Sequence, residues 1–144
     1  MISRAYIIIC IGLVLLFASC GRQHSAEQTV KAFIEANMEN GGDDISGRDF
    51  ADLGTTRLIS DSLIQLMRHR GAPLFKQGIS YPDTPHGELY YLRMSYVHDG
   101  DTLQNTFYLN QELTEVVAFK YLFLKKVGEI FAGLKKRLYL CTRI

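Results

Sequence analysis

The spacing of hydrophobic residues changes several times along the chain and divides it into elements. An apolar run extends from about Tyr6 to Phe17. Apolar residues then recur every three or four positions in 25–38 and again in 60–70, which is the period of an amphipathic helix. From 89 to 123 the period is two, as in strands, and after that it returns to three or four. The pattern predicts helices followed by strands and a final helix.

The segment "SAEQTVKAFIEANMENGG" is expected to form the first helix of the folded domain. Ser25 is a natural N-cap, and Gln28 three residues later completes a capping box. Gly41 and Gly42 end the helical pattern. The apolar stripe of this helix consists of Val30, Phe33, Ile34 and Met38.

A second helix is expected in "TTRLISDSLIQLMRHRG". Ser60 or Asp61 would cap its start, and Gly71 with Pro73 would stop it. The stretch "DDISGRDFADLG" before it is expected to be a loop or a short helix. The residues of the second helix that are expected to be buried are Leu63, Ile64, Leu66 and Met67.

The second half of the domain alternates in the manner of antiparallel strands. "LFKQGISY" is a candidate strand, and "PDTPHG" is a turn or a longer loop. "ELYYLRMSYVH", "TLQNTFYLN" and "VVAFKYLFL" are the stronger strands, joined by the short connections "DGD" and "QELTE". Because such short connections join antiparallel neighbours, we expect a curled meander sheet with the N-terminal helices covering one face. The fold class predicted is α+β, with a C-terminal amphipathic helix.

The first 19 residues have the order of a signal peptide. Arg4 supplies a positive charge, the apolar run follows, and the small residues Ala18 and Ser19 precede Cys20. A run of about 12 residues is too short for a permanent span, which needs about 20. With Phe17 where leucine is usual, "FASC" resembles the lipobox of bacterial lipoproteins. The resemblance implies cleavage before Cys20, a diacylglycerol thioether on its sulfur and N-acylation of its new amine.

A lipoprotein would be organised as signal peptide 1–19, lipidated tether 20–24, α+β domain 25–123 and C-terminal helix 124–144. Two or three acyl chains would anchor the protein firmly in the membrane, since each buried methylene contributes about 0.8 kcal/mol of membrane-binding free energy. "GRQ" after the cysteine has neither the aspartate of inner-membrane retention nor the acidic residues of surface export in the Bacteroidetes. We therefore expect an outer-membrane location facing the periplasm. An ordinary secretory signal and an uncleaved anchor helix are the alternatives.

The order of a long helix, short helices and a curling meander resembles the cystatin-like folds of the nuclear-transport-factor-two and ketosteroid-isomerase group. The resemblance covers roughly 25–123 and is architectural. For enzymes of that group it implies a cavity between sheet and helices with a carboxylate base and hydrogen-bond donors. No residue of this chain aligns with those roles. Tyr90, Arg93 and Tyr96 are candidates for such a pocket, although strand tyrosines more often pack with their hydroxyls at the surface.

The sequence holds no recognisable catalytic or metal-binding pattern. Its four histidines lack the spacing of metal ligands on one element. His86 and Glu88 fall in a turn-like "PHGE", and the "HDGD" pair Asp99 and Asp101 is typical of a tight hairpin. Cys141 has no histidine near it in sequence that could activate it. We therefore expect no catalytic residue, no metal and no cofactor other than the covalent lipid.

The C-terminal segment 124–144 is predicted to be a basic amphipathic helix. Residues 121–144 hold six Lys or Arg against one Asp or Glu, whereas residues 20–120 hold nine against fourteen. Such a segment could lie on an anionic membrane, bind an acidic partner or fold back onto its own acidic domain. The cations that are candidates for membrane or partner contact are Lys125, Lys126, Lys135, Lys136 and Arg137.

These observations predict a lipid-anchored lipoprotein of the cell envelope that acts as a binding or structural module rather than as an enzyme. A small ligand carrier or enzyme that uses a cavity between sheet and helices is the alternative. The formal net charge of +1 gives no indication of nucleic-acid binding. The partners expected are the membrane, through the lipid anchor, and an envelope protein.

Overall fold

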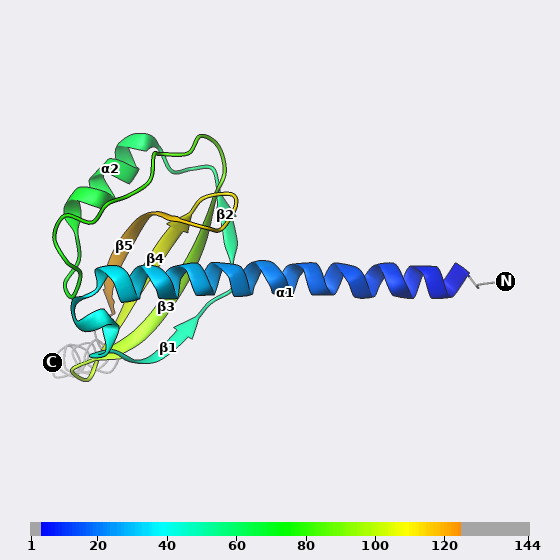
Figure 1. Cartoon of the computed structure of the whole chain (residues 1–144), viewed down its shortest axis with the longest axis horizontal. Coiled ribbons are helices and arrows are strands. Elements are labelled where there is room, and N and C mark those ends of the chain that lie inside the picture. Colours follow the sequence, from blue (N-terminus) through cyan, green and yellow to red (C-terminus); the bar gives the residue numbers. More distant parts are fainter. Residues whose placement is uncertain (1–3, 125–144) are drawn as a thin grey trace, which may run out of the picture.

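The computed structural model describes residues 4–124, with side chains for 21–122 (Figure 1). It contains two α-helices and a five-stranded antiparallel sheet, which confirms the α+β fold expected from the sequence. The predicted C-terminal helix falls outside the described residues, apart from Leu124, which ends the last strand. The other residues predicted to matter that lie outside are Lys125, Lys126, Lys135, Lys136, Arg137 and Cys141.

Helix α1 spans Arg4–Asn37 and so begins well before the predicted N-cap. Ser25 lies inside the helix, where its hydroxyl donates to the carbonyl of Gly21 at 3.0 Å. The capping-box prediction is therefore wrong, because the helical backbone continues through 20–24, the segment expected to be a tether. An i,i+4 hydrogen bond of 2.8 Å from Gln23 to Glu27 supports this turn. The buried face of α1 carries Ala26, Val30 and Ile34, and Met38 continues it just beyond the helix.

The chain between the two α-helices forms strands, so the prediction of a loop or short helix is wrong there. A 3₁₀ helix, η1 (Glu39–Gly42), turns the chain after α1. Strands β1 (Ser46–Phe50) and β2 (Gly54–Thr56) then pair antiparallel with successive parts of one longer strand. All five residues of β1 are exposed or half-buried. The conformation of β1 is therefore decided by its backbone pairing with β3, and its side-chain pattern does not predict a strand.

Helix α2 (Asp61–Arg70) begins where the sequence predicted. Ser60 is its N-cap and accepts a hydrogen bond of 3.4 Å from the Leu63 amide. Ile64 is fully buried, but Leu63 and Leu66 are 38% and 52% exposed. Their predicted burial is wrong, because α2 meets the sheet along a narrow contact with the last strand.

The antiparallel meander is confirmed. The sheet order is β1-β3-β4-β5, and β2 also pairs with β3. Asp99 and Gly100 turn the first hairpin with φ values of 50° and 83°, as Asp-Gly pairs do. The candidate strand at 74–81 forms only one isolated bridge, from Phe75 to Met38. The three strands of the meander are β3 (Leu89–His98), β4 (Asp101–Leu109) and β5 (Val116–Leu124).

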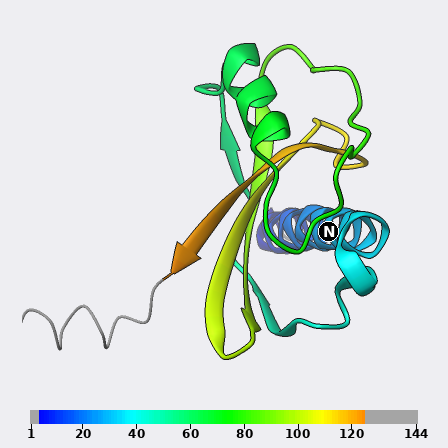
Figure 2. The same ribbon diagram turned by 90° about the vertical axis from the view of Figure 1, so that its left-hand side faces the viewer.

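The two helices pack on opposite faces of the sheet, which corrects the expectation that both cover one face. Helix α1, seen end-on in Figure 2, covers the face that carries Leu92 and Phe107. Helix α2 packs on the other face, where Ile64 meets Leu89 and Ala118. The aromatic centre of the α1 side is tight: the Phe33 ring lies 6.0 Å from Phe107 and 5.8 Å from Phe119. The α2 side is covered only in part.

Candidate functional site

The three residues proposed from the sequence for a pocket do not share one. Tyr96 is fully buried in the α1 core. Tyr90 is half-buried, and its hydroxyl accepts a hydrogen bond of 3.2 Å from Arg22. Arg93 is exposed on the opposite face of β3, with its guanidinium carbon 5.5 Å from the centroid of the Tyr91 ring. The separation follows from the geometry of a strand. Arg93 points to the face opposite Tyr90 and Tyr96, because odd and even positions alternate. Tyr90 and Tyr96 share a face but lie about 20 Å apart, because six residues of a strand span that length.

In the two other pairs noted in the sequence, His86 with Glu88 and Asp99 with Asp101, one carboxylate of each makes a structural contact. Glu88 forms an ion pair of 3.4 Å with Arg57. His98 bonds the Asp44 carbonyl at 3.1 Å and lies 3.2 Å from the Asp99 carboxylate. These contacts fix turns at the ends of β3.

Tyr96 lies near a second buried polar side chain, Asn105 on β4. Both residues are fully buried, and neither the Tyr96 hydroxyl nor the Asn105 amide has a hydrogen-bond partner among the described residues. Burial raises the pKa of Tyr96 to about 12; Tyr121 adds to this rise, and the nearby Asn105 amide opposes it. A buried amide without a hydrogen-bond partner costs about 1–3 kcal/mol.

Asn105→Leu is therefore expected to raise the free energy of unfolding by about 1 kcal/mol, because leucine fills a similar volume and leaves no polar group unsatisfied. The measurement is the midpoint of urea unfolding of the purified chain. Asn110→Leu is the matched control and should destabilise, because the Asn110 side chain accepts from the Thr114 amide at 2.9 Å. A loss of stability in Asn105→Leu as large as in the control would contradict this reading of the buried amide.

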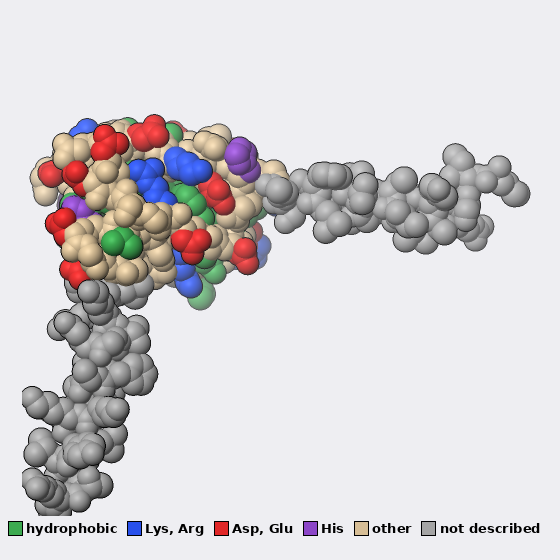
Figure 3. All heavy atoms as spheres, turned by 90° about the horizontal axis from the view of Figure 1, so that it is seen from below, with side chains coloured by type: hydrophobic (Ala, Val, Ile, Leu, Met, Phe, Trp, Pro, Cys, Tyr) green, Lys and Arg blue, Asp and Glu red, His purple; other side chains and the backbone are tan. Residues whose placement is uncertain are grey.

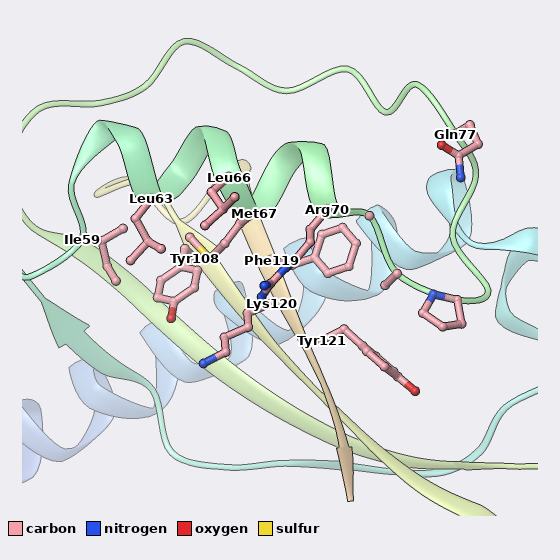
Figure 4. A pocket seen from close by; sticks show the side chains of 13 residues that line it. Ile59, Leu63, Leu66, Met67, Arg70, Gln77, Tyr108, Phe119, Lys120 and Tyr121 are labelled. Carbon is pink, nitrogen blue, oxygen red and sulfur yellow. The ribbon is translucent and has the colours of Figure 1, made fainter.

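A cavity of about 760 Å³ lies between α2 and β5 (Figure 4), and we call it the α2–β5 cavity. Its volume falls in the range of about 300–1,000 Å³ that small-molecule sites occupy. The lining comes from α2 and the residues that flank it, from β4 and from β5. The main apolar and aromatic residues of its walls are Ile59, Leu63, Leu66, Met67, Tyr108, Phe119 and Tyr121.

The cavity reaches around the edge that β5 forms in the described sheet. Strand β5 is the last strand in the sheet order. Phe119, Lys120 and Tyr121 all line the cavity, although successive residues of a strand point to opposite faces. The loop after α2 closes the far side with Ala72 and Pro73. Short-range sequence patterns could not predict this cavity, because its lining joins the loop after α2 to β5, and these segments are almost fifty residues apart.

Arg68 links α2 to β5 and to the loop that follows α2. Its Nε donates to the Val117 carbonyl at 2.9 Å, and its Nη2 donates to the Pro82 carbonyl at 2.8 Å. Its guanidinium also lies 5.0 Å from the centroid of the Tyr81 ring. Gly71, with φ 58°, then ends α2 in a conformation that other residues rarely adopt and turns the chain into the closing loop.

The charged residues of the lining are both cations, Arg70 and Lys120. Figure 4 shows Arg70 reaching from the last turn of α2 toward β5, between Tyr108 and Tyr121. Burial raises the pKa of Tyr108, which Arg93 partly offsets, so its hydroxyl stays protonated at neutral pH and can donate a hydrogen bond. No carboxylate, histidine, serine or cysteine is among the described lining residues. The lining can therefore bind an apolar body and a negative charge.

Comparison of the chain with protein-family models, curated proteins and solved structures found no match. The resemblances to bacterial lipoproteins and to the cystatin-like fold group stay predictions. Within the described part of the chain, no helix combines the length and hydropathy needed to cross a membrane. Nor does any group of three or more His, Cys, Asp or Glu side chains in that part have the arrangement of a metal site.

Proposed function

We propose that this chain is a lipid-anchored protein of the cell envelope whose α+β domain binds a small amphipathic molecule in the α2–β5 cavity. The observation that carries the binding role is the cavity itself, with apolar walls and a volume of about 760 Å³. A binding role fits the lining better than catalysis, because the described lining offers no carboxylate or histidine to act as a general base.

The anchor rests on the N-terminal sequence. Cys20 lies within helix α1, next to the part of the helix that packs on the sheet. Three residues after Cys20, the Gln23 amide accepts from the Leu53 amide at 2.8 Å and donates to the Ala51 carbonyl at 3.2 Å. A lipid on Cys20 would thus hold the domain close to the membrane surface, where amphipathic molecules are concentrated.

The exposed leucines of α2 support a ligand at this place. Leu63 and Leu66 are 38% and 52% exposed, and both line the cavity. An apolar chain lying against them would remove their surface from water, which contributes about 25 cal/mol for each Å² covered. Grouped apolar exposure on a folded domain commonly marks a binding surface.

The test is photo-crosslinking of the full chain in phosphatidylcholine nanodiscs with a palmitic acid that carries a diazirine and an alkyne. We expect crosslinked peptides from α2 and β5. The double variant Leu63→Gln with Leu66→Gln should lower this labelling about tenfold, since roughly 1.4 kcal/mol of binding free energy corresponds to that factor. Glutamine keeps the helix propensity and adds no charge.

The matched control is Leu58→Gln with Leu122→Gln. These leucines are 91% and 47% exposed but do not line the α2–β5 cavity. The control should label as the unmodified chain does. If crosslinks spread over the surface without preference for α2 and β5, or if both double variants lose labelling equally, the proposed binding function is wrong.

A further inference from the structure

We infer that the α2–β5 cavity selects single-chain amphiphiles with an anionic head group, a carboxylate or a phosphate, which Arg70 and Lys120 bind while the apolar chain lies along α2. This inference rests on the proposed binding function and specifies its ligand. It starts from two cations in a lining that is otherwise apolar or neutral.

These two cations have no structural task among the described residues. Neither Arg70 nor Lys120 forms an ion pair or a side-chain hydrogen bond with another described residue. Arg68, two residues before Arg70, shows the contrast, because it is occupied by two backbone carbonyls. Arg57 is likewise occupied, by Glu88. Arg70 and Lys120 therefore keep their donors available for a ligand.

The charge of the cavity lining also favours an anionic ligand. Residues 20–120 hold fourteen Asp or Glu against nine Lys or Arg, so the domain has an excess of negative charge. Acidic and basic side chains are interspersed on the face seen in Figure 3. The α2–β5 lining contains two cations and no carboxylate, so its charge is opposite in sign to the net charge of the domain. Such a site attracts an anion and repels a cation of the same shape.

The arrangement of the lining separates the cations from the apolar residues of α2. In Figure 4, Arg70 extends toward β5, and Lys120 extends from β5 to the side on which Tyr108 lies. The Tyr108 hydroxyl adds a neutral donor on that side. Leu63 and Ile59 lie beyond Tyr108 toward the start of α2. An anionic head near the two cations would leave its chain facing the apolar residues of α2. A guanidinium and an ammonium both bind carboxylate and phosphate oxygens through charge-assisted hydrogen bonds.

The test compares head groups on one chain. The full chain in phosphatidylcholine nanodiscs is crosslinked with the diazirine-alkyne palmitic acid, with its neutral methyl ester and with the corresponding alkyl phosphate. We expect both anionic probes to label α2 and β5 about ten times more than the ester. The ratio of carboxylate to phosphate labelling shows which head group is preferred.

The variant Arg70→Gln with Lys120→Gln should bring labelling by the anionic probes down to the level of the ester and leave labelling by the ester unchanged. Arg57→Gln removes one cation outside the cavity and is the control; it should behave as the unmodified chain. If the acid and the ester label the cavity equally, head-group selection is wrong and the binding function stands. If no probe labels α2 or β5, the proposed function fails as well.

Discussion

Cys20→Ala is expected to abolish fatty-acid incorporation into this chain. In the lipobox reading, the sulfur of Cys20 carries the diacylglycerol, and cleavage on its N-terminal side depends on that modification. Alanine offers no sulfur, so neither acylation nor cleavage can occur. The measurement is metabolic labelling with an alkyne fatty acid, followed by mass determination of the purified chain. We expect the unmodified chain to lack residues 1–19 and to carry the lipid mass.

The chain supplies its own controls for this experiment. Cys10 lies within the apolar run, and Cys141 lies near the C-terminus. Cys10→Ala and Cys141→Ala should each leave labelling unchanged. Persistent acylation of Cys20→Ala would overturn the anchor. A chain that loses residues 1–19 without gaining lipid would indicate an ordinary secretory signal, and an unlabelled full-length chain would indicate an uncleaved anchor.

Phe107→Ala is expected to lower the free energy of unfolding by about 3–5 kcal/mol, because truncation of a buried phenylalanine removes its transfer free energy and leaves a cavity. Phe107 is fully buried on the central strand β4, and its ring lies 6.0 Å from Phe33 and 5.8 Å from Phe119. It therefore joins α1 to the last two strands. Against a typical domain stability of about 5–15 kcal/mol, this loss brings the fold close to unfolding.

Urea unfolding monitored by near-ultraviolet circular dichroism measures this loss, since the chain has eight tyrosines and no tryptophan. Thr106→Ala is the neighbouring control. It lies on the opposite face of β4, is half-buried and should cost less than about 1 kcal/mol. A loss in Phe107→Ala no larger than that of the control would show that the aromatic centre does not carry the stability of the α1 side.

The meander could be predicted because its determinants are close together in sequence. Alternation in 89–98 places Leu92, Met94 and Tyr96 on one face, and the structure buries all three. Asp99 and Gly100 fix the hairpin by their own conformational preference, and the register then follows from His98 opposite Asp101. The N-cap of α2 at Ser60 was equally local. In each case the residues that decide the structure lie within a few positions of one another.

The strands β1 and β2 and the start of α1 could not be predicted in the same way. β1 carries no alternation, and it is a strand because β3 offers a free edge that pairs with it. Ser25 has the side chain of an N-cap, but its position is decided by whether the backbone before it is helical. A local preference of about 1 kcal/mol does not prevail over continuation of the helix and the contacts of Gln23.

The sequence by itself determined the fold class, the meander, the second helix and the prediction of a lipid anchor at Cys20, because each depends on a short run of residues. Only the tertiary structure decided that α1 and α2 cover opposite faces and that a cavity opens between α2 and β5. Arg68 and Val117, whose hydrogen bond links α2 to β5, are 49 positions apart. Periodicity shows that Leu63 and Leu66 belong to an apolar stripe. Whether other residues of the protein cover that stripe or leave it exposed to a ligand depends on how far β5 extends beneath α2.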